Sequence, residues 1–211
     1  MIAIFIFYII IKNMSIYIKN QAFKNSLLIS IDSAQKVSKT LDFDTFSLLF
    51  AQNNLVGVNF FEVPSDVLKK FNFSYGSLTA ELRETLNSLI SEKIKDHPEY
   101  LIPQKNNYLS AQIIDIKKHE NSNNLDFVTL KADQEYEVVT NLKGLKIGDN
   151  VTVATLGTLL ANGKVVGYEK IANHFSKVML VSEKTMKISE ELKPYSSNLE
   201  IGKEILFTWK I

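Results

Sequence analysis

At about Tyr108 the chain changes to a strand-like hydrophobic period of two, and this change restricts what its second half can fold into. In residues 127–132, one face carries Val128 and Leu130 while the other carries Phe127. An Asn-Gly pair between two later runs is a strong hairpin signal. We expect strands over residues 110–117, 127–132, 136–140, 150–155, 164–168, 178–181 and 204–209. Short strands at this spacing predict a small barrel or sandwich.

The first half combines short apolar runs with one clear helical pattern. Strand-length runs rich in β-branched and aromatic side chains occupy residues 26–31, 46–51 and 55–61. A Pro-Ser-Asp turn then opens a short helical stretch over residues 67–71. Apolar side chains recur every four residues between 78 and 94, which predicts a helix with Ser77 as its cap. The preferred reading of this apolar stripe is packing against the preceding strands, with a partner-binding helix as the alternative.

These patterns divide the chain into four parts. Residues 1–13 form an apolar N-terminal extension and residues 14–96 an N-terminal domain. Residues 97–107, which hold two of the four prolines, are the linker, and residues 108–211 form the second domain. These patterns predict an α+β N-terminal domain followed by a small all-β barrel or sandwich.

The first eleven residues carry no charge. This run is too short to span a bilayer, which needs roughly 20 apolar residues. The preferred interpretation is that this run is a strand, or that the translation start was placed too far upstream and Met14 is the true start. A membrane-associated or signal-like segment and an unusual interface are the alternatives. We expect no stable membrane insertion and a cytoplasmic protein, which the absence of cysteine also fits.

Charge gives little support to a nucleic-acid partner. The formal net charge of the chain is +1, and Arg83 is its only arginine. From Tyr108 onward there are 13 lysines and 13 acidic residues, so the predicted barrel is formally neutral. Because phosphate binding depends on cationic side chains, any RNA site has to come from local segregation of these charges.

Sequence motifs for catalysis and metal binding are missing. The three histidines, His97, His119 and His174, are too scattered to suggest a zinc-binding pair. Residues 157–165 superficially resemble a phosphate-binding loop, but Val165 stands where a Ser or Thr must bind magnesium. We therefore expect no enzyme activity, no metal and no cofactor.

From about Ser110 to Thr185 the order of features resembles the EMAP-type tRNA-binding domain, which is appended to methionyl- and phenylalanyl-tRNA synthetases. His119, Asn121 and Leu125 fit the loop between that family's first two strands. The run from Ser176 to Ser182 resembles its Ser-x-Gly-Met signature, with Val178 in place of the glycine. The usual Arg-Gly just upstream is replaced by Ala-Asn-His.

The N-terminal half, with a Val-Gly-x-Asn-x-Phe-like element at residues 56–60, resembles the N-terminal domain of bacterial YtpR-type proteins. Together the two resemblances cover nearly all of the chain after Met14. They imply that the α+β N-terminal domain is followed by an all-β OB-fold barrel, and that one face of this barrel binds tRNA or another structured RNA without catalysing a reaction. An aminoacyl-tRNA synthetase and a second copy of the chain are the protein partners considered. The alternative function is a protein-interaction or dimerisation module that has lost strong RNA binding.

The resemblance implies that Asn121, Asn141, Ser176 and Met179 belong to the RNA-binding face. From the residues themselves we add four lysines as phosphate contacts and two ring-bearing side chains beside them. The complete predicted site is His119, Asn121, Asn141, Lys143, Lys146, Lys164, Phe175, Ser176, Lys177 and Met179. Each has a structural alternative as a turn, core or solvated surface residue.

Overall fold

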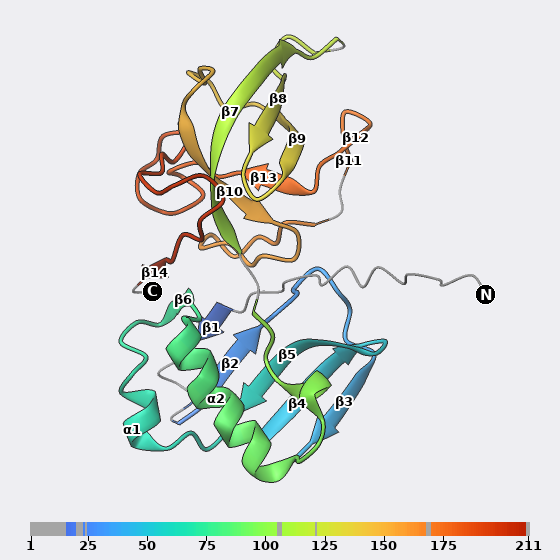
Figure 1. Ribbon diagram of the computed structural model, residues 1–211, viewed down its shortest axis with the longest axis vertical. Coiled ribbons are helices and arrows are strands. Elements are labelled where there is room, and N and C mark those ends of the chain that lie inside the picture. Colours follow the sequence, from blue (N-terminus) through green and yellow to red (C-terminus); the bar gives the residue numbers. More distant parts are fainter. Residues whose placement is uncertain are drawn as a thin grey trace, which may run out of the picture.

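The structure is a computed structural model that describes residues 16–19, 23, 25–104, 107–120, 122–167 and 170–209. The predicted N-terminal extension, residues 1–13, lies outside these ranges. In Figure 1 a sheet with its helices forms the lower half and a barrel forms the upper half. The two halves follow one another along the chain, except that the C-terminal end returns to the lower half.

The lower half is built on an antiparallel sheet of seven strands in the order β14-β6-β1-β2-β5-β4-β3. Its strands are β1 (Ile16–Ile18), β2 (Leu27–Ser30), β3 (Lys39–Asp42), β4 (Phe46–Ala51), β5 (Asn54–Phe60), β6 (Tyr75–Ser77) and β14 (Thr208–Trp209). The helices are α1 (Ser65–Leu68), α2 (Ala80–Lys93) and the 3-10 helix η1 (Pro98–Tyr100).

Helix α2 packs on one face of this sheet, as its apolar stripe predicts. Leu86 and Ile90 are fully buried in a core shared with β2, β4 and β5. Burying one such side chain contributes roughly 1.5–3 kcal/mol. The cap is Thr79, whose hydroxyl accepts a hydrogen bond from the Leu82 backbone N–H at 3.3 Å. The predicted cap, Ser77, instead belongs to β6.

The α+β fold class predicted for the N-terminal domain is wrong. Strands make up 38% of the structure and helices 11%, and the described residues form only two α-helices, one of them four residues long. The prediction relied on the single long helix. Five strands of the sheet, β1, β2, β3, β6 and β14, have only two to four residues each. Such short strands cannot display a readable alternation.

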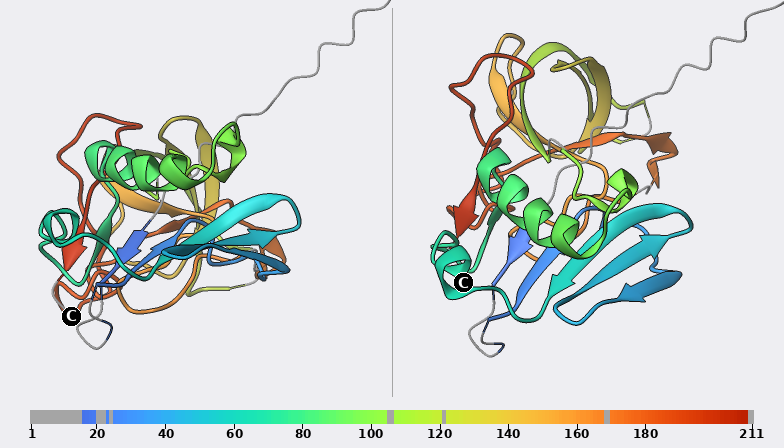
Figure 2. Two further views of the ribbon diagram at one scale, coloured as in Figure 1. Left: turned by 90° about the horizontal axis from the view of Figure 1, so that it is seen from below. Right: turned by 60° about the horizontal axis from the view of Figure 1, so that its bottom comes forward.

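The upper half is a nearly closed barrel of five antiparallel strands in the order β13-β10-β7-β8-β9. Strands β9 and β13 also approach each other, and the right view of Figure 2 shows the resulting ring. This order is compatible with an OB-like fold. The strands are β7 (Tyr108–Lys118), β8 (Asp126–Lys131), β9 (Glu135–Thr140), β10 (Asn150–Thr155) and β13 (Val178–Leu180).

The connection between β10 and β13 carries two hairpins. The first contains the predicted Asn-Gly turn, where Gly163 has a φ of +83° and the Leu160 N–H bonds to the Lys164 carbonyl at 2.7 Å. No strand forms over the predicted residues 164–167 that the structure describes; only a single bridge joins Leu159 to Val165. The second hairpin is β11 (Lys170–Ile171) with β12 (His174–Phe175).

The two halves share a buried cluster. It contains Ile16 and Tyr75 from the lower sheet together with Tyr108, Leu160 and Ile205 from the upper half. The Tyr75 hydroxyl donates to the Leu159 carbonyl across this boundary. The C-terminal segment adds β14 to the lower sheet, so the barrel is attached at both its beginning and its end. In the part of the chain described, no helix has the length and apolar character that crossing a membrane requires.

Candidate functional site

A groove crosses the outer face of β8 and β9. It consists of two neighbouring hollows of about 380 and about 400 Å3, which share Thr129, Glu137 and His174. The side chains that define the groove are Lys117, Lys118, His119, Glu120, Phe127, Thr129, Glu135, Glu137, His174, Phe175 and Lys177. Lysines lie at both ends, with Lys117 and Lys118 in the first hollow and Lys177 in the second.

The alternation of the strands explains why these side chains meet. Lys117 lies opposite Phe127, and Thr129 lies opposite Glu137, in the pairing of β7 with β8 and β8 with β9. The intervening residues Val128 and Val138 fill the barrel core. Because successive side chains point to opposite faces, the residues between core positions form the floor of the groove.

Three rings form an aromatic cluster in the first hollow. The His119 ring stacks on Phe127 with 5.4 Å between centroids and 8° between planes. His174 approaches Phe127 edge-on from the β11–β12 hairpin, at 4.5 Å and 79°. His119 is 8% exposed, whereas the His174 side chain is 27% exposed. The cluster thus joins the end of β7, strand β8 and the hairpin into one wall of the groove.

The β11–β12 hairpin has an unusual backbone at its tip. Ala172 and Asn173 both have a positive φ, of 49° and 65°. Two successive positive φ angles are typical of the tight turn that joins antiparallel strands. Asparagine tolerates this region, whereas alanine does so at a cost. The tip of this hairpin lines the first hollow, so its backbone directs His174 toward Phe127.

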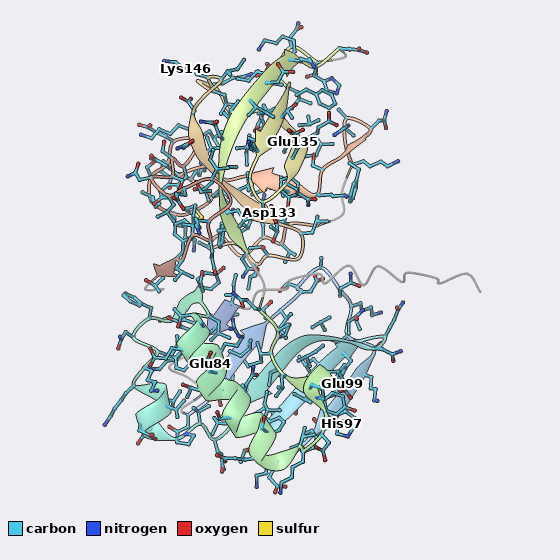
Figure 3. The ribbon with its side chains drawn as sticks, viewed as in Figure 1. Glu84, His97, Glu99, Asp133, Glu135 and Lys146 are labelled. Carbon is cyan, nitrogen blue, oxygen red and sulfur yellow. The ribbon has the colours of Figure 1, made fainter. Side chains whose placement is uncertain are left out.

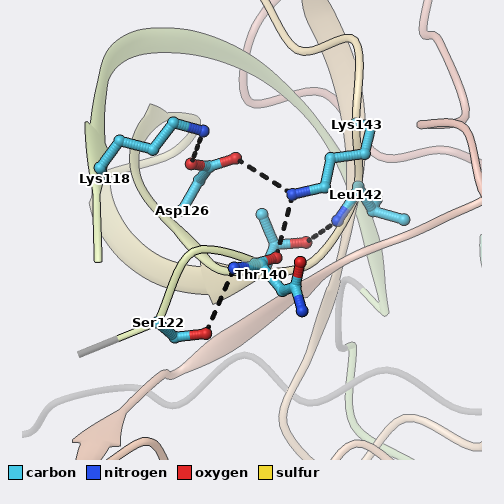
Figure 4. A network of polar contacts seen from close by, with 7 residues as sticks. Lys118, Ser122, Asp126, Thr140, Leu142 and Lys143 are labelled. Atoms are coloured by element: carbon cyan, nitrogen blue, oxygen red, sulfur yellow. Dashed lines mark hydrogen bonds and ion pairs between the residues drawn. The ribbon is translucent and has the colours of Figure 1, made fainter. Parts of the chain in front are cut away.

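A polar network fixes the loop between β7 and β8 against the connection after β9, as Figure 4 shows. The Asp126 side chain, 8% exposed, accepts a hydrogen bond from the Lys118 ammonium at 2.6 Å. The Lys143 ammonium lies 4.0 Å from Asp126 and donates to the Asn124 carbonyl at 3.0 Å. A hydrogen bond to an ionised group is stronger than one between neutral groups. The network therefore fixes Lys118, which lines the first hollow, and places Lys143 beside the same carboxylate.

Acidic neighbours offset several cations of the groove. The Lys117 ammonium lies 2.8 Å from Asp115, and this hydrogen bond raises the pKa of Lys117 and lowers the pKa of Asp115. Glu137 lies 4.0 Å from Nε2 of His174. The groove is therefore a mixed-charge surface rather than a uniformly basic one.

The structure brings several of the predicted site residues to this groove. His119, Phe175 and Lys177 line it directly. The Ser176 hydroxyl accepts a long hydrogen bond, 3.4 Å, from the Val139 N–H and so links the hairpin to β9. Asn141 is exposed two residues before Lys143, in the connection that the polar network holds.

Other predicted residues lie elsewhere. Lys146 is at the upper left of the barrel in Figure 3, away from the β11–β12 hairpin. Lys164 belongs to the hairpin that contacts the lower half through Leu159. Met179 is half-buried and packs against the cluster shared by the two halves. Asn121 lies outside the described residues.

Eight of the groove residues named above were not predicted from the sequence: Lys117, Lys118, Glu120, Phe127, Thr129, Glu135, Glu137 and His174. Phe127 had a readable signal, because its alternation with Val128 places it on the outer face of its strand. For His174 there was no such signal in the sequence. Its position depends on a hairpin whose tip contains neither a glycine nor an Asn-Gly pair.

The described residues contain no group of three or more His, Cys, Asp and Glu side chains placed to hold a metal ion. Comparison of the sequence with models of known protein families and with curated proteins finds no match. The site therefore has to be interpreted from its own geometry.

Proposed function

We propose that this chain binds RNA, without catalysing a reaction, in the groove on the outer face of β8 and β9. The observation that carries the proposal is the aromatic cluster around Phe127, placed between lysines at the two ends of one groove. Proteins that bind single-stranded nucleic acid stack bases on rings and place cations along the phosphate backbone.

The position of the groove in the barrel supports the same function. If the barrel is an OB-fold, then β7, β8, β9, β10 and β13 are its strands one to five. OB-folds bind oligonucleotides on the face of strands two and three, between the loop that joins strands one and two and the loop that joins strands four and five. Here the groove lies on β8 and β9, between the loop containing His119 and the β11–β12 hairpin.

The class of RNA that we propose as the partner is inferred from the sequence. The order of features from Ser110 to Thr185 resembles the EMAP-type tRNA-binding domain, and the N-terminal half resembles YtpR-type proteins. We therefore propose tRNA as the partner, contacted at unpaired nucleotides. Lys117 and Lys118 are each paired with an acidic side chain. Each lysine has to leave this carboxylate before it can bind a phosphate, so we expect the affinity for RNA to be modest.

Fluorescence anisotropy tests this function. Labelled tRNA and a single-stranded RNA of equal length are titrated with the full chain at low and moderate salt. We expect binding that weakens as salt rises, because bound phosphates release counterions. Lys177→Glu is expected to weaken binding, whereas Lys36→Glu, on the exposed surface of the lower half, leaves it unchanged. Absence of binding at low salt contradicts the proposal.

The second candidate is a protein-interaction or dimerisation module. It is favoured by exposed apolar side chains along the C-terminal segment. These are Ile188, Leu192, Leu199, Ile201 and Leu206, each 36–58% exposed. Exposed apolar surface marks interaction sites when it is contiguous. Sedimentation of the chain over a wide concentration range tests this candidate: a dimer that dissociates in Leu192→Ser supports it, and a monomer at all concentrations excludes dimerisation.

A further inference from the structure

Glu137 occupies the middle of the groove. It lines both hollows, as do only Thr129 and His174, and its side chain is 66% exposed. It lies opposite Thr129 on the neighbouring strand. The Nε2 atom of the His174 imidazole lies 4.0 Å from this carboxylate. A ligand that fills either hollow therefore meets the Glu137 carboxylate.

The carboxylates of the groove determine which part of an RNA can face its floor. Glu120 lies in the first hollow and Glu135 in the second, with Glu137 between them. A phosphate at this floor meets like charges, whereas the lysines at the two ends attract it. We therefore expect the phosphates of a bound RNA strand to lie near the lysines at the two ends of the groove. Its bases then face the floor of the groove, where Glu137 lies.

An ionised carboxylate can only accept hydrogen bonds, through two oxygens side by side. Unpaired RNA bases present their Watson–Crick edges to such a group. Guanine offers two adjacent donors there, the N1–H and the 2-amino group, which match the two oxygens. Adenine and cytosine offer one amino group on that edge, and uracil one N–H. Bidentate contacts are the ones that discriminate between bases.

We infer that Glu137 selects guanine, so that the RNA segment held in this groove carries an unpaired guanosine. This inference rests on the proposed function and specifies its substrate. The rings of the aromatic cluster hold any base by stacking, and the Glu137 carboxylate distinguishes among them.

The test uses four labelled hexauridine-based RNAs, each with its two central positions replaced by G, A, C or left as U. Anisotropy is measured with the full chain at one moderate salt concentration. We expect the G-containing RNA to bind about tenfold more tightly than the others, the size of a bidentate contact to one base. In Glu137→Gln this preference is expected to fall below about twofold, because one acceptor oxygen is replaced by a donor.

Glu84→Gln is the matched control, since it removes the same charge from the exposed surface of α2 in the lower half. It is expected to keep the wild-type preference for guanine. Equal affinity of all four RNAs for the wild-type chain, with tRNA still bound, overturns this inference and leaves the proposed function standing. A guanine preference that survives in Glu137→Gln also overturns it. If neither the oligonucleotides nor tRNA binds, the proposed function fails and the inference fails with it.

Discussion

The ring of His119 lies parallel to the ring of Phe127, with 5.4 Å between their centroids. His119 directly follows β7 and Phe127 lies in β8, so the stack joins the start of the loop between these strands to β8. His174 of the β11–β12 hairpin closes the cluster from a segment more than forty residues further along the chain. This relationship is what connects the proposed RNA-binding function to the fold.

Phe127→Ala is expected to weaken RNA binding by roughly 5- to 150-fold, because stacking of one base on a ring contributes about 1–3 kcal/mol. Anisotropy titration with tRNA measures the effect. Phe61→Ala removes a partly exposed ring from the lower half and serves as the control, which should bind as the wild type does. Equal affinity of Phe127→Ala and the wild type, with both folded by circular dichroism, contradicts the role of the cluster.

The partly buried carboxyl of Glu204 makes the free energy of unfolding depend on pH. Its Oε1 atom is buried, with no hydrogen-bond partner among the described residues, and burial raises the pKa of its carboxyl to about 7. The charge of Arg83 offsets part of this increase. The unfolded chain releases the same proton near pH 4.5, so between about pH 4.5 and 7 the folded state binds more protons. The free energy of unfolding therefore decreases as pH rises through this window.

Glu204→Gln is expected to remove that decrease, so that its melting temperature exceeds that of the wild type at pH 8. Thermal unfolding at a series of pH values measures it. Glu200→Gln, whose side chain is 82% exposed, is the control and should follow the wild-type profile. A wild-type chain and a Glu204→Gln variant with parallel pH profiles would show that this carboxyl is not the cause.

Gly202 holds the C-terminal segment against the barrel. Its N–H bonds to the Ser110 carbonyl at 2.8 Å, and its φ is +80°. A Cβ atom there would lie 3.1 Å from the Ala132 carbonyl oxygen. Gly202→Ala is therefore expected to lower the melting temperature more than Gly148→Ala, which has a φ of +93° and open space around it. Both substitutions carry the cost of placing a Cβ atom on left-handed backbone, roughly 1–2 kcal/mol, so equal losses would exclude a steric contribution.

Local patterns predicted some of the regular elements. The strands at residues 46–51 and 150–155 have the predicted bounds, and the helix predicted over 78–94 spans Ala80–Lys93. The helix shows a period of about four because one of its faces is buried, whereas residues 46–51 form a short apolar run that is buried on both faces. The predicted strand at 204–209 is mostly irregular, with only Thr208–Trp209 in β14. Its pairing partner, β6, lies more than a hundred residues earlier and has no local signal.

The candidate site was only partly predictable, since it depends on contacts between distant segments. His119 and Phe175 were identified individually, but nothing local indicates that Phe127 and His174 would join them. The lysines were chosen by charge alone. Lys164 lies instead on the hairpin that contacts the lower half, because the Tyr75–Leu159 hydrogen bond holds that hairpin at the boundary.

An NMR titration tests the central claim most directly. Backbone amide signals of the isotopically labelled full chain are followed while unlabelled tRNA or a short single-stranded RNA is added. We predict shifts concentrated at Phe127, Thr129, Glu137 and residues 174–177, which surround the groove. Signals of α2 should stay in place. Shifts confined to the lower half or to the C-terminal segment, or no shifts at saturating RNA, would contradict binding in the groove.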